Sequence, residues 1–482
     1  MNTLEALIAL AVLTLGISAS VLVSFGSQSL AVDVQTNREA LSKAHAALED
    51  TRATSRQDFA SIVSQATTTD DMYLKRFELL DDEQCKKVVL SRVVWNVTPS
   101  RHEKVELQSS LGDIALALAY GGDCIVDPPH SIWDNPQRFA SDTISTGKST
   151  AIDVLDKIAY IGADHSPYFY IADTTLAVLG QTSGLLVVFG NGFDAGAQIN
   201  SLDAIHDLSS GKNYVFAAMD APTNQLEVID VTDIHNPVIA ATRSLSPCVA
   251  GSYPQGWRVR YYGGKLYVTT RFTAGPEFHV FDVTTPANPT EYTIGGGVCR
   301  GFNLGDTAND FVVKDQIVGG MSKRFIYLAT DEIDKELRVF DVTDPIHMSE
   351  VTPANQDLPG AQNGLSVFLL GNKLYVGRQS TPGGPDLYIY GVSNPLAGLT
   401  LLDSQDIGTG VLAIRVAGRF AFLATPKSNK EFQVWDISKP LAITRIKDYS
   451  FGNIVDEGLD YESDSIYATG QATPNFQMLY RP

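Results

Sequence analysis

A repeated strand-and-turn element constrains the fold of this chain more than any other feature. Each copy alternates apolar with polar residues and then ends in a turn rich in Asp, Ser, Asn and Pro. The clearest copies are LEVIDVTDIHNP (226–237), FHVFDVTTPANP (278–289), LRVFDVTDP (337–345), LYIYGVSNP (387–395) and FQVWDISKP (432–440). They recur about every 50 residues, and such a period is typical of repeat architectures.

Further strands precede each copy, so the repeating unit has about four strands. The strand immediately upstream is seen in KLYVTTRF (265–272), FIYLATDE (325–332) and KLYVGRQS (373–380). Four antiparallel strands in a repeated unit are the signature of β-propeller blades. The pattern resembles LVIVD-repeat propellers, and it covers roughly residues 150–482.

Two degenerate units decide how the ring closes. One begins at 149–175, and the other, 458–482, stops after its third strand. The segment 134–145 matches the outer-strand sequence 235–244 of a complete unit. We therefore expect residues 136–145 to supply the missing strand and to close a propeller over 136–482, with seven blades or alternatively six.

The first 25 residues form an apolar segment whose single charge is Glu5. No charged residue occurs from Ala6 through Phe25, a run that would span about 30 Å as a helix. A signal peptide is disfavoured, since no Lys or Arg precedes Arg38. The next stretch lacks proline and spaces apolar residues helically, at Leu30, Val34, Leu41 and Leu48.

These features predict one continuous helix over residues 1–55. Its apolar half, 1–25, suits a membrane or an assembly, whereas its amphipathic half, 26–55, can lie on a globular domain. Gly16 and Gly26 are its expected points of flexibility. The predicted fold class is thus mainly β with one long N-terminal α-helix, a small α+β head and a β-propeller.

The segment TLEALIALA (3–11) resembles the mature N-terminus of type IV pilins and pseudopilins. The resemblance implies processing by a prepilin peptidase, methylation of the new terminus and insertion in the inner membrane before assembly by the pilus machinery. It also implies that Glu5 pairs with the Met1 amine of a neighbouring copy in a homopolymer, because a buried carboxylate needs a partner. Under this interpretation Met1 is the processed terminus.

Residues 56–128 form the expected small head, which is similar to that of minor pilins and pseudopilins. Strands are predicted over 86–99 and 103–110, and DPP (127–129) opens a stiff linker over 129–135. Two disulfides are predicted. Cys85 and Cys124 bracket the head, and Cys248 and Cys299 follow the outer strands of consecutive blades.

Composition and motifs favour a structural or binding protein. The net charge is −19, with 36 basic and 55 acidic residues, which argues against nucleic-acid binding. The sequence lacks HExxH, GxSxG and EF-hand patterns, so we predict no catalytic residue, metal or cofactor. The recurring Asp230, Asp282, Asp341 and Asp436 are expected to accept turn hydrogen bonds.

Together these features predict a structural subunit of a pilus-like extracellular filament. The chain would polymerise through its N-terminal helix and display the propeller at the cell surface for adhesion or partner binding. One alternative is a minor pilin or pseudopilin at a pilus tip or in a secretion-system pseudopilus. Another is a membrane-anchored propeller enzyme.

Overall fold

The computed structural model of the chain divides into two compact units, Met1–Val126 (unit 1) and Asp127–Pro482 (unit 2). The residues that the structure describes are 13–15, 17, 18, 20, 33–52, 54, 62, 64–70, 72–82, 86–98, 101–112, 132–144, 147–175, 177–181, 186–245, 254–271, 273–294, 300–380, 382–439, 441–452, 458–462, 465–471 and 473–481.

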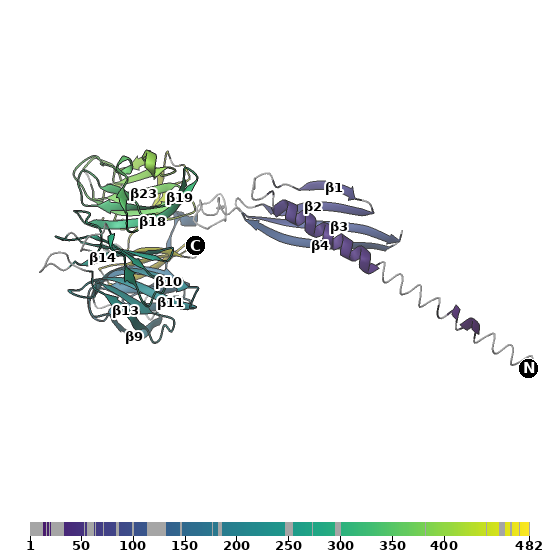
Figure 1. Cartoon of the computed structure of the whole chain (residues 1–482), viewed down its shortest axis with the longest axis horizontal. Coiled ribbons are helices and arrows are strands. Elements are labelled where there is room, and N and C mark those ends of the chain that lie inside the picture. Colours follow the sequence, from purple (N-terminus) through teal and green to yellow (C-terminus); the bar gives the residue numbers. More distant parts are fainter. Residues whose placement is uncertain are drawn as a thin grey trace, which may run out of the picture. The chain divides into compact units, whose positions relative to one another are not determined.

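Unit 1 combines a helix over residues 33–52 with one four-stranded antiparallel sheet of order β1-β2-β3-β4 (Figure 1). Its strands are β1 (Gln65–Asp70), β2 (Tyr73–Asp82), β3 (Lys86–Thr98) and β4 (Arg101–Gly112). The strands predicted over 86–99 and 103–110 are present as β3 and β4. Alternating residues of β3 face the helix, which is why Val89, Val93 and Trp95 are buried.

The helix of unit 1 packs through small residues. Ala40 and Ala44 are fully buried against Tyr73, Val93 and Trp95. Leu48 continues the same face one turn later, against a second cluster. In contrast, Val34 and Leu41 are 47% and 48% exposed, so the predicted apolar stripe was wrong at these two positions.

The predicted fold class, in which a long pilin-like helix over 1–55 defines the N-terminal part, needs correction. The extended helical run among the described residues is 33–52, and strands in eight four-stranded sheets dominate. In the described part of the chain, no helix has the length and apolarity needed to cross a membrane. A sequence without proline permits a helix, but most helical stability in proteins comes from packing of one face.

Unit 2 contains seven antiparallel four-stranded sheets among its described residues. In six of them the strands follow chain order, and we call them the first, second, third and outer strands of a sheet. Sheet 1 is β6 (Ser149–Leu155), β7 (Ile158–Ala163), β8 (Tyr168–Asp173) and β9 (Leu186–Asp194). Sheet 2 is β10 (Gln198–Asp207), β11 (Lys212–Asp220), β12 (Leu226–Asp230) and β13 (Val238–Arg243). Sheet 3 is β14 (Gly256–Tyr262), β15 (Lys265–Thr270), β16 (Phe278–Asp282) and β17 (Thr290–Glu291).

The remaining sheets continue in the same order. Sheet 4 is β18 (Ala308–Val318), β19 (Met321–Thr330), β20 (Leu337–Asp341) and β21 (Ser349–Glu350). Sheet 5 is β22 (Gly364–Leu370), β23 (Lys373–Arg378), β24 (Leu387–Gly391) and β25 (Thr400–Gln405). Sheet 6 is β26 (Ala413–Ala417), β27 (Phe420–Ala424), β28 (Phe432–Asp436) and β29 (Thr444–Tyr449). Sheet 7 is β30 (Leu459–Glu462), β31 (Ser465–Thr469), β32 (Phe476–Tyr480) and β5 (Gln137–Asp142). Short 3-10 turns lie at Ile132–Asp134, Thr352–Ala354 and Pro395–Ala397.

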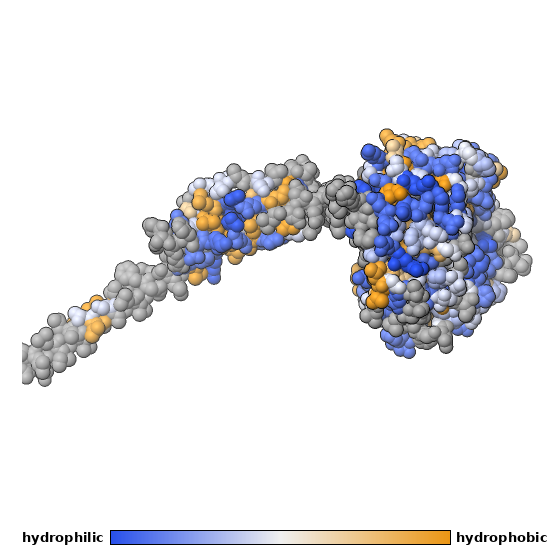
Figure 2. Space-filling view, turned by 180° about the vertical axis from the view of Figure 1, so that it is seen from behind, coloured by the Kyte–Doolittle hydropathy of each residue, from blue (hydrophilic) through white to orange (hydrophobic). Residues whose placement is uncertain are grey.

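The seven sheets form a propeller-like ring. The first strand of each sheet contacts the first strand of the next, and β30 of sheet 7 contacts β6 of sheet 1. Apolar residues of neighbouring sheets fill the space between them, as Tyr327 and Leu374 do between sheets 4 and 5. The face of unit 2 in Figure 2 is mostly hydrophilic, in keeping with the acidic composition.

The ring closes through a strand from the beginning of unit 2. β5 pairs antiparallel with β32, with Ala140 opposite Met478 and Gln137 opposite Tyr480. Just before β5, the buried Trp133 packs edge-on against Phe422 of sheet 6, with a centroid distance of 4.7 Å. The segment that enters the ring is therefore fixed to sheet 6 as well as to sheet 7.

We predict that Trp133→Ala destabilises unit 2. The ring is 1% exposed, and loss of a buried Trp leaves a cavity that costs about 3–5 kcal/mol. Urea unfolding followed by far-ultraviolet circular dichroism measures this, with the exposed Asp134→Ala as the control. Equal unfolding midpoints for the two variants would contradict the prediction.

Candidate functional site

The residues that the sequence predicted for assembly and cross-linking lie outside the described residues. Their roles in pairing, flexibility and disulfide formation therefore stay predictions. They are Met1, Glu5, Gly16, Gly26, Cys85, Cys124, Cys248 and Cys299.

The recurring aspartates at the ends of third strands accept turn hydrogen bonds, as predicted. Asp230 Oδ1 accepts from the Thr232 amide at 3.0 Å, and Asp282 Oδ1 accepts from the Thr284 amide at 2.9 Å. The same contact occurs at Asp341 and Asp436, with distances of 3.0 and 2.8 Å. These carboxylates are thus structural groups of each sheet.

A second polar position recurs in the sheets and was not predicted from the sequence. It is the buried residue directly before the third strand, and its side chain accepts from the backbone of the connection to the next sheet. Glu277 accepts from the Leu304 amide at 2.8 Å, and Glu336 from the Leu358 amide at 2.8 Å. Burial raises the pKa of both carboxyls. The full set is Gln225, Glu277, Glu336, Asp386, Glu431 and Asn475.

Three aspartates occupy the same register position in the first strands of sheets 7, 1 and 2. Asp460 accepts from the Val154 amide at 2.9 Å, Asp153 accepts from the Ala204 amide at 2.6 Å, and Asp203 accepts from the Tyr261 amide. Each therefore reaches the first strand of the next sheet.

Electrostatics in this part of the ring are strongly coupled. Burial, with the neighbouring Asp460 and Asp203, raises the pKa of Asp153 well above its usual range. Burial also raises the pKa of Asp203 to about 6, although the nearby Arg260 opposes the shift. Arg415 donates to Asp460 at 3.0 Å. Because every aspartate already accepts a backbone hydrogen bond, we assign the group to ring assembly.

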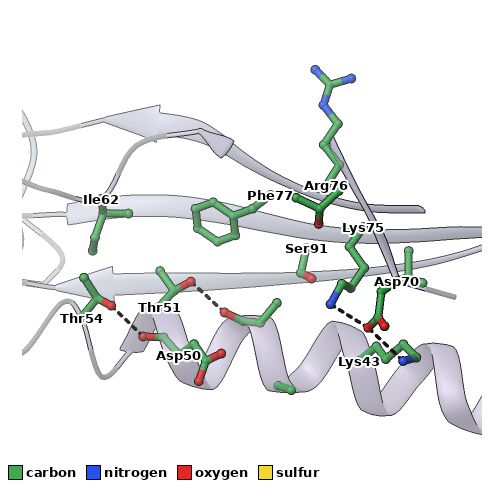
Figure 3. Close-up of a pocket in the computed structure, with 14 residues that line it drawn as sticks. Lys43, Asp50, Thr51, Thr54, Ile62, Asp70, Lys75, Arg76, Phe77 and Ser91 are labelled. Carbon is green, nitrogen blue, oxygen red and sulfur yellow. Dashed lines mark hydrogen bonds and ion pairs between the residues drawn. The ribbon is translucent and has the colours of Figure 1, made fainter. Parts of the chain in front are cut away.

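Unit 1 has a cavity of about 390 Å³ between its helix and β1–β3 (Figure 3). Lys43 of the helix and Lys75 of β2 both contact the Asp70 carboxylate, at 2.9 and 2.8 Å. These two lysines lower the pKa of Asp70 to about 2. Arg76 points away from the helix in Figure 3. The ion pairs thus connect helix and sheet, and this cavity is a weaker ligand-site candidate.

Unit 2 has a larger cavity, of about 690 Å³, which we call the mouth cavity. Each of sheets 3 to 6 contributes residues at two equivalent positions, and neighbouring residues complete the lining. One position is near the start of the first strand, and the other follows the second strand. The lining side chains used below are Trp257, Arg271, Asn309, Asp331 and Asn363.

Asp331 organises the polar side of the mouth cavity. Its Oδ1 accepts from the Asn309 and Asn363 side-chain amides, both at 2.6 Å. The Asn309 amide also donates to the Gly364 carbonyl at 2.7 Å. On another side of the cavity, the guanidiniums of Arg271 and Arg258 lie 4.0 and 4.5 Å from the Trp257 ring centroid. The volume falls within the range of pockets that hold small organic ligands.

Comparisons with known proteins identify no family. No protein-family profile matches the chain, and no curated protein matches it. Among solved structures, the crystal structure of the computationally designed Ika8 protein is similar to 72% of this chain over its whole length, with 10% identity and a TM-score of 0.46.

The assignment to type IV pilins or pseudopilins fused to an LVIVD-type propeller was therefore wrong as a family identification. Neither a profile nor a curated relative supports it, and sheets dominate the described residues. The pilin resemblance rested on one short apolar stretch with one glutamate. Membrane-length apolar segments of unrelated proteins share such a composition.

We predict that Asp203→Asn flattens the pH dependence of stability. The pKa of Asp203 is about 6 in the folded protein, against about 4 in an unfolded chain. The folded state binds this proton more tightly, so the carboxyl's contribution to stability is present below about pH 4 and is lost as the pH rises through 6. The amide cannot titrate and still offers an oxygen to the Tyr261 amide.

Urea unfolding at several pH values between 4 and 7 measures the effect, with the exposed Asp134→Asn as the control. The wild-type and control proteins should lose more stability than Asp203→Asn as the pH rises. Parallel pH profiles for all three proteins would refute the assignment.

Proposed function

We propose that this chain is a structural subunit of an extracellular filament and that its ring displays a ligand-binding mouth. The observation that carries the binding role is the mouth cavity, to which four consecutive sheets contribute side chains at equivalent positions. A cavity of this size with a few convergent polar groups is a favourable ligand site. The role is one of binding and display, with adhesion or partner capture as its outcome.

The proposed attachment to the filament rests on the sequence of residues 1–25. Glu5 is the single charge of this segment, so burial among apolar neighbours requires a partner group from another copy. The segment would lie in a membrane before assembly.

The helix of unit 1 offers additional support for contacts between copies. Val34 and Leu41 are seven residues apart and therefore share one face of the helix. Both are about half exposed, whereas Ala40 and Ala44 face the sheet. These two exposed apolar side chains, with Asn37 and Arg38 between them on the same face, can contribute to contacts with a neighbouring copy.

One observation favours a propeller enzyme as the second candidate. The raised pKa values of Asp153 and Asp203 are of the kind often found at catalytic sites. However, both carboxylates accept backbone hydrogen bonds from the next sheet. We therefore favour binding over catalysis.

We predict that Glu5→Ala removes the chain from cell-surface filaments. The apolar segment keeps its length, but the charge that would select the register between copies is gone. Electron microscopy of surface filaments and immunoblotting of the sheared fraction measure incorporation. The control is Glu49→Ala, since Glu49 is an exposed helix residue with solvent-exposed ion pairs.

Incorporation of Glu5→Ala at the wild-type level would rule out the assembly role of Glu5. Absence of the wild-type chain from surface filaments would rule out the filament proposal as a whole. A few copies per filament would identify a minor subunit.

A further inference from the structure

We infer that the mouth cavity binds a neutral, polyhydroxylated ligand of the saccharide class through an acceptor cluster centred on Asp331. The inference rests on the proposed display function, because it names the ligand class of the displayed ring. It rests on which hydrogen-bond donors and acceptors of Asn309, Asp331 and Asn363 already have partners in the protein and which do not.

The donors of this cluster are largely used within the protein. The side-chain amide nitrogen of Asn309 carries two hydrogens, and it donates to Asp331 and to the Gly364 carbonyl. The Asn363 amide donates to the same Asp331 oxygen. Three acceptor oxygens remain without a partner among the described residues: Oδ2 of Asp331 and Oδ1 of Asn309 and Asn363.

A ligand that satisfies this cluster must therefore bring donors. Hydroxyl groups and ammonium groups both qualify. Arg271, an exposed cation lining the same cavity, disfavours a positively charged ligand. The acceptor oxygens of a negatively charged ligand would face the acceptor oxygens of the cluster, and the Asp331 carboxylate would repel its charge. Neutral hydroxyl groups remain the best match.

Sheet 3, which neighbours sheet 4 in the ring, supplies a flat surface. The Arg271 guanidinium lies 4.0 Å from the centroid of the Trp257 ring, so a delocalised planar cation covers the indole. Pyranose rings present one apolar face of C–H groups, and such a face packs well on planar side chains. Adjacent hydroxyl groups on the ring edge can donate to a carboxylate at the same time.

The repeat provides a matched comparison position. Asp220 of sheet 2 and Asp331 of sheet 4 both come near the end of a second strand, Asp220 as the last residue of β11 and Asp331 directly after β19. The described lining of the mouth cavity includes Asp331 and does not include Asp220. Asp220→Asn thus makes the same chemical change outside the proposed site.

The experiment uses the full chain in its assembled filaments. A glycan array with neutral, acidic and amino sugars screens for binding, and the strongest neutral glycan is then titrated by calorimetry. Asp331→Asn replaces an acceptor by a donor, and Arg271→Ala removes the planar cation that lies over the indole. Each should weaken binding by about tenfold or more, the loss expected for a charge-assisted hydrogen bond or a comparable contact. Asp220→Asn should bind like the wild type.

Filament assembly is measured in parallel, so that failure of the proposed ligand class can be distinguished from failure of the proposed display function. Intact filaments that bind no neutral glycan, or that prefer acidic glycans or trilysine, would overturn the ligand class while the display function stands. Equal glycan affinities of Asp331→Asn and Asp220→Asn would show that the glycan does not bind in the mouth cavity. Thermal unfolding of each variant checks that the ring is folded, and Arg271→Ala, which changes an exposed side chain, carries the test if Asp331→Asn does not fold.

Discussion

The closure of the ring between sheets 7 and 1 is the interaction on which the rest of unit 2 depends. Every sheet has apolar residues on both faces, so each needs two neighbours to bury them, and an open ring would leave two sheets half exposed. β5 completes sheet 7 by pairing with β32. Asn475 then accepts from the Ile144 amide at 2.8 Å and donates to the Gly147 carbonyl at 3.0 Å, which anchors the chain as it leaves β5.

Polar contacts reinforce the same junction along the first strands. Asp460 of β30 accepts from the Val154 amide, and Glu462 accepts from the Asp156 and Lys157 amides at 2.7 Å each. Carboxylates that are withdrawn from water are unfavourable unless they are hydrogen-bonded, and here each half-buried carboxylate accepts from a backbone donor. Burial is the main cause of the raised pKa of Asp153 and Asp203, and the neighbouring carboxylates add to it.

The buried acids before the third strands connect this assembly to the mouth cavity. Glu277 holds the amides of Leu304 and Gly305, shortly before Asn309 in the chain. Glu336 holds the Leu358 amide, shortly before Asn363. Because the connections are fixed by buried side chains, the amides that flank Asp331 start from defined positions. A preorganised site of this kind loses less conformational entropy on binding.

The sequence was informative where the repeat is local. Third strands and their turn aspartates could be read from it, since a turn carboxylate accepts from a residue two positions later. The match of 134–145 to an outer strand also pointed to β5. The buried position of Glu277 could not be read in this way, because an acid before a strand looks like an exposed turn residue. The face of the helix that packs on the sheet was predicted wrongly. The small Ala40 and Ala44 face the sheet, whereas the larger Val34 and Leu41 are about half exposed.

The mouth cavity could not be predicted because it depends on equivalence between sheets rather than on one motif. Trp257 lies on β14, Asn309 lies on β18 and Asp331 directly follows β19, so these residues are brought together by the register around the ring.

The ring is asymmetric in the same register. Opposite an aromatic residue of each second strand, sheets 7, 1 and 2 carry Asp460, Asp153 and Asp203, and sheets 3 and 6 carry arginines. Sheets 4 and 5 carry Val312 and Phe368 there. The carboxylates that fix the closing junction therefore lie in one part of the ring, whereas sheets 3 to 6 supply the mouth cavity. This separation lets the mouth vary in sequence without loosening the junction that holds the ring together.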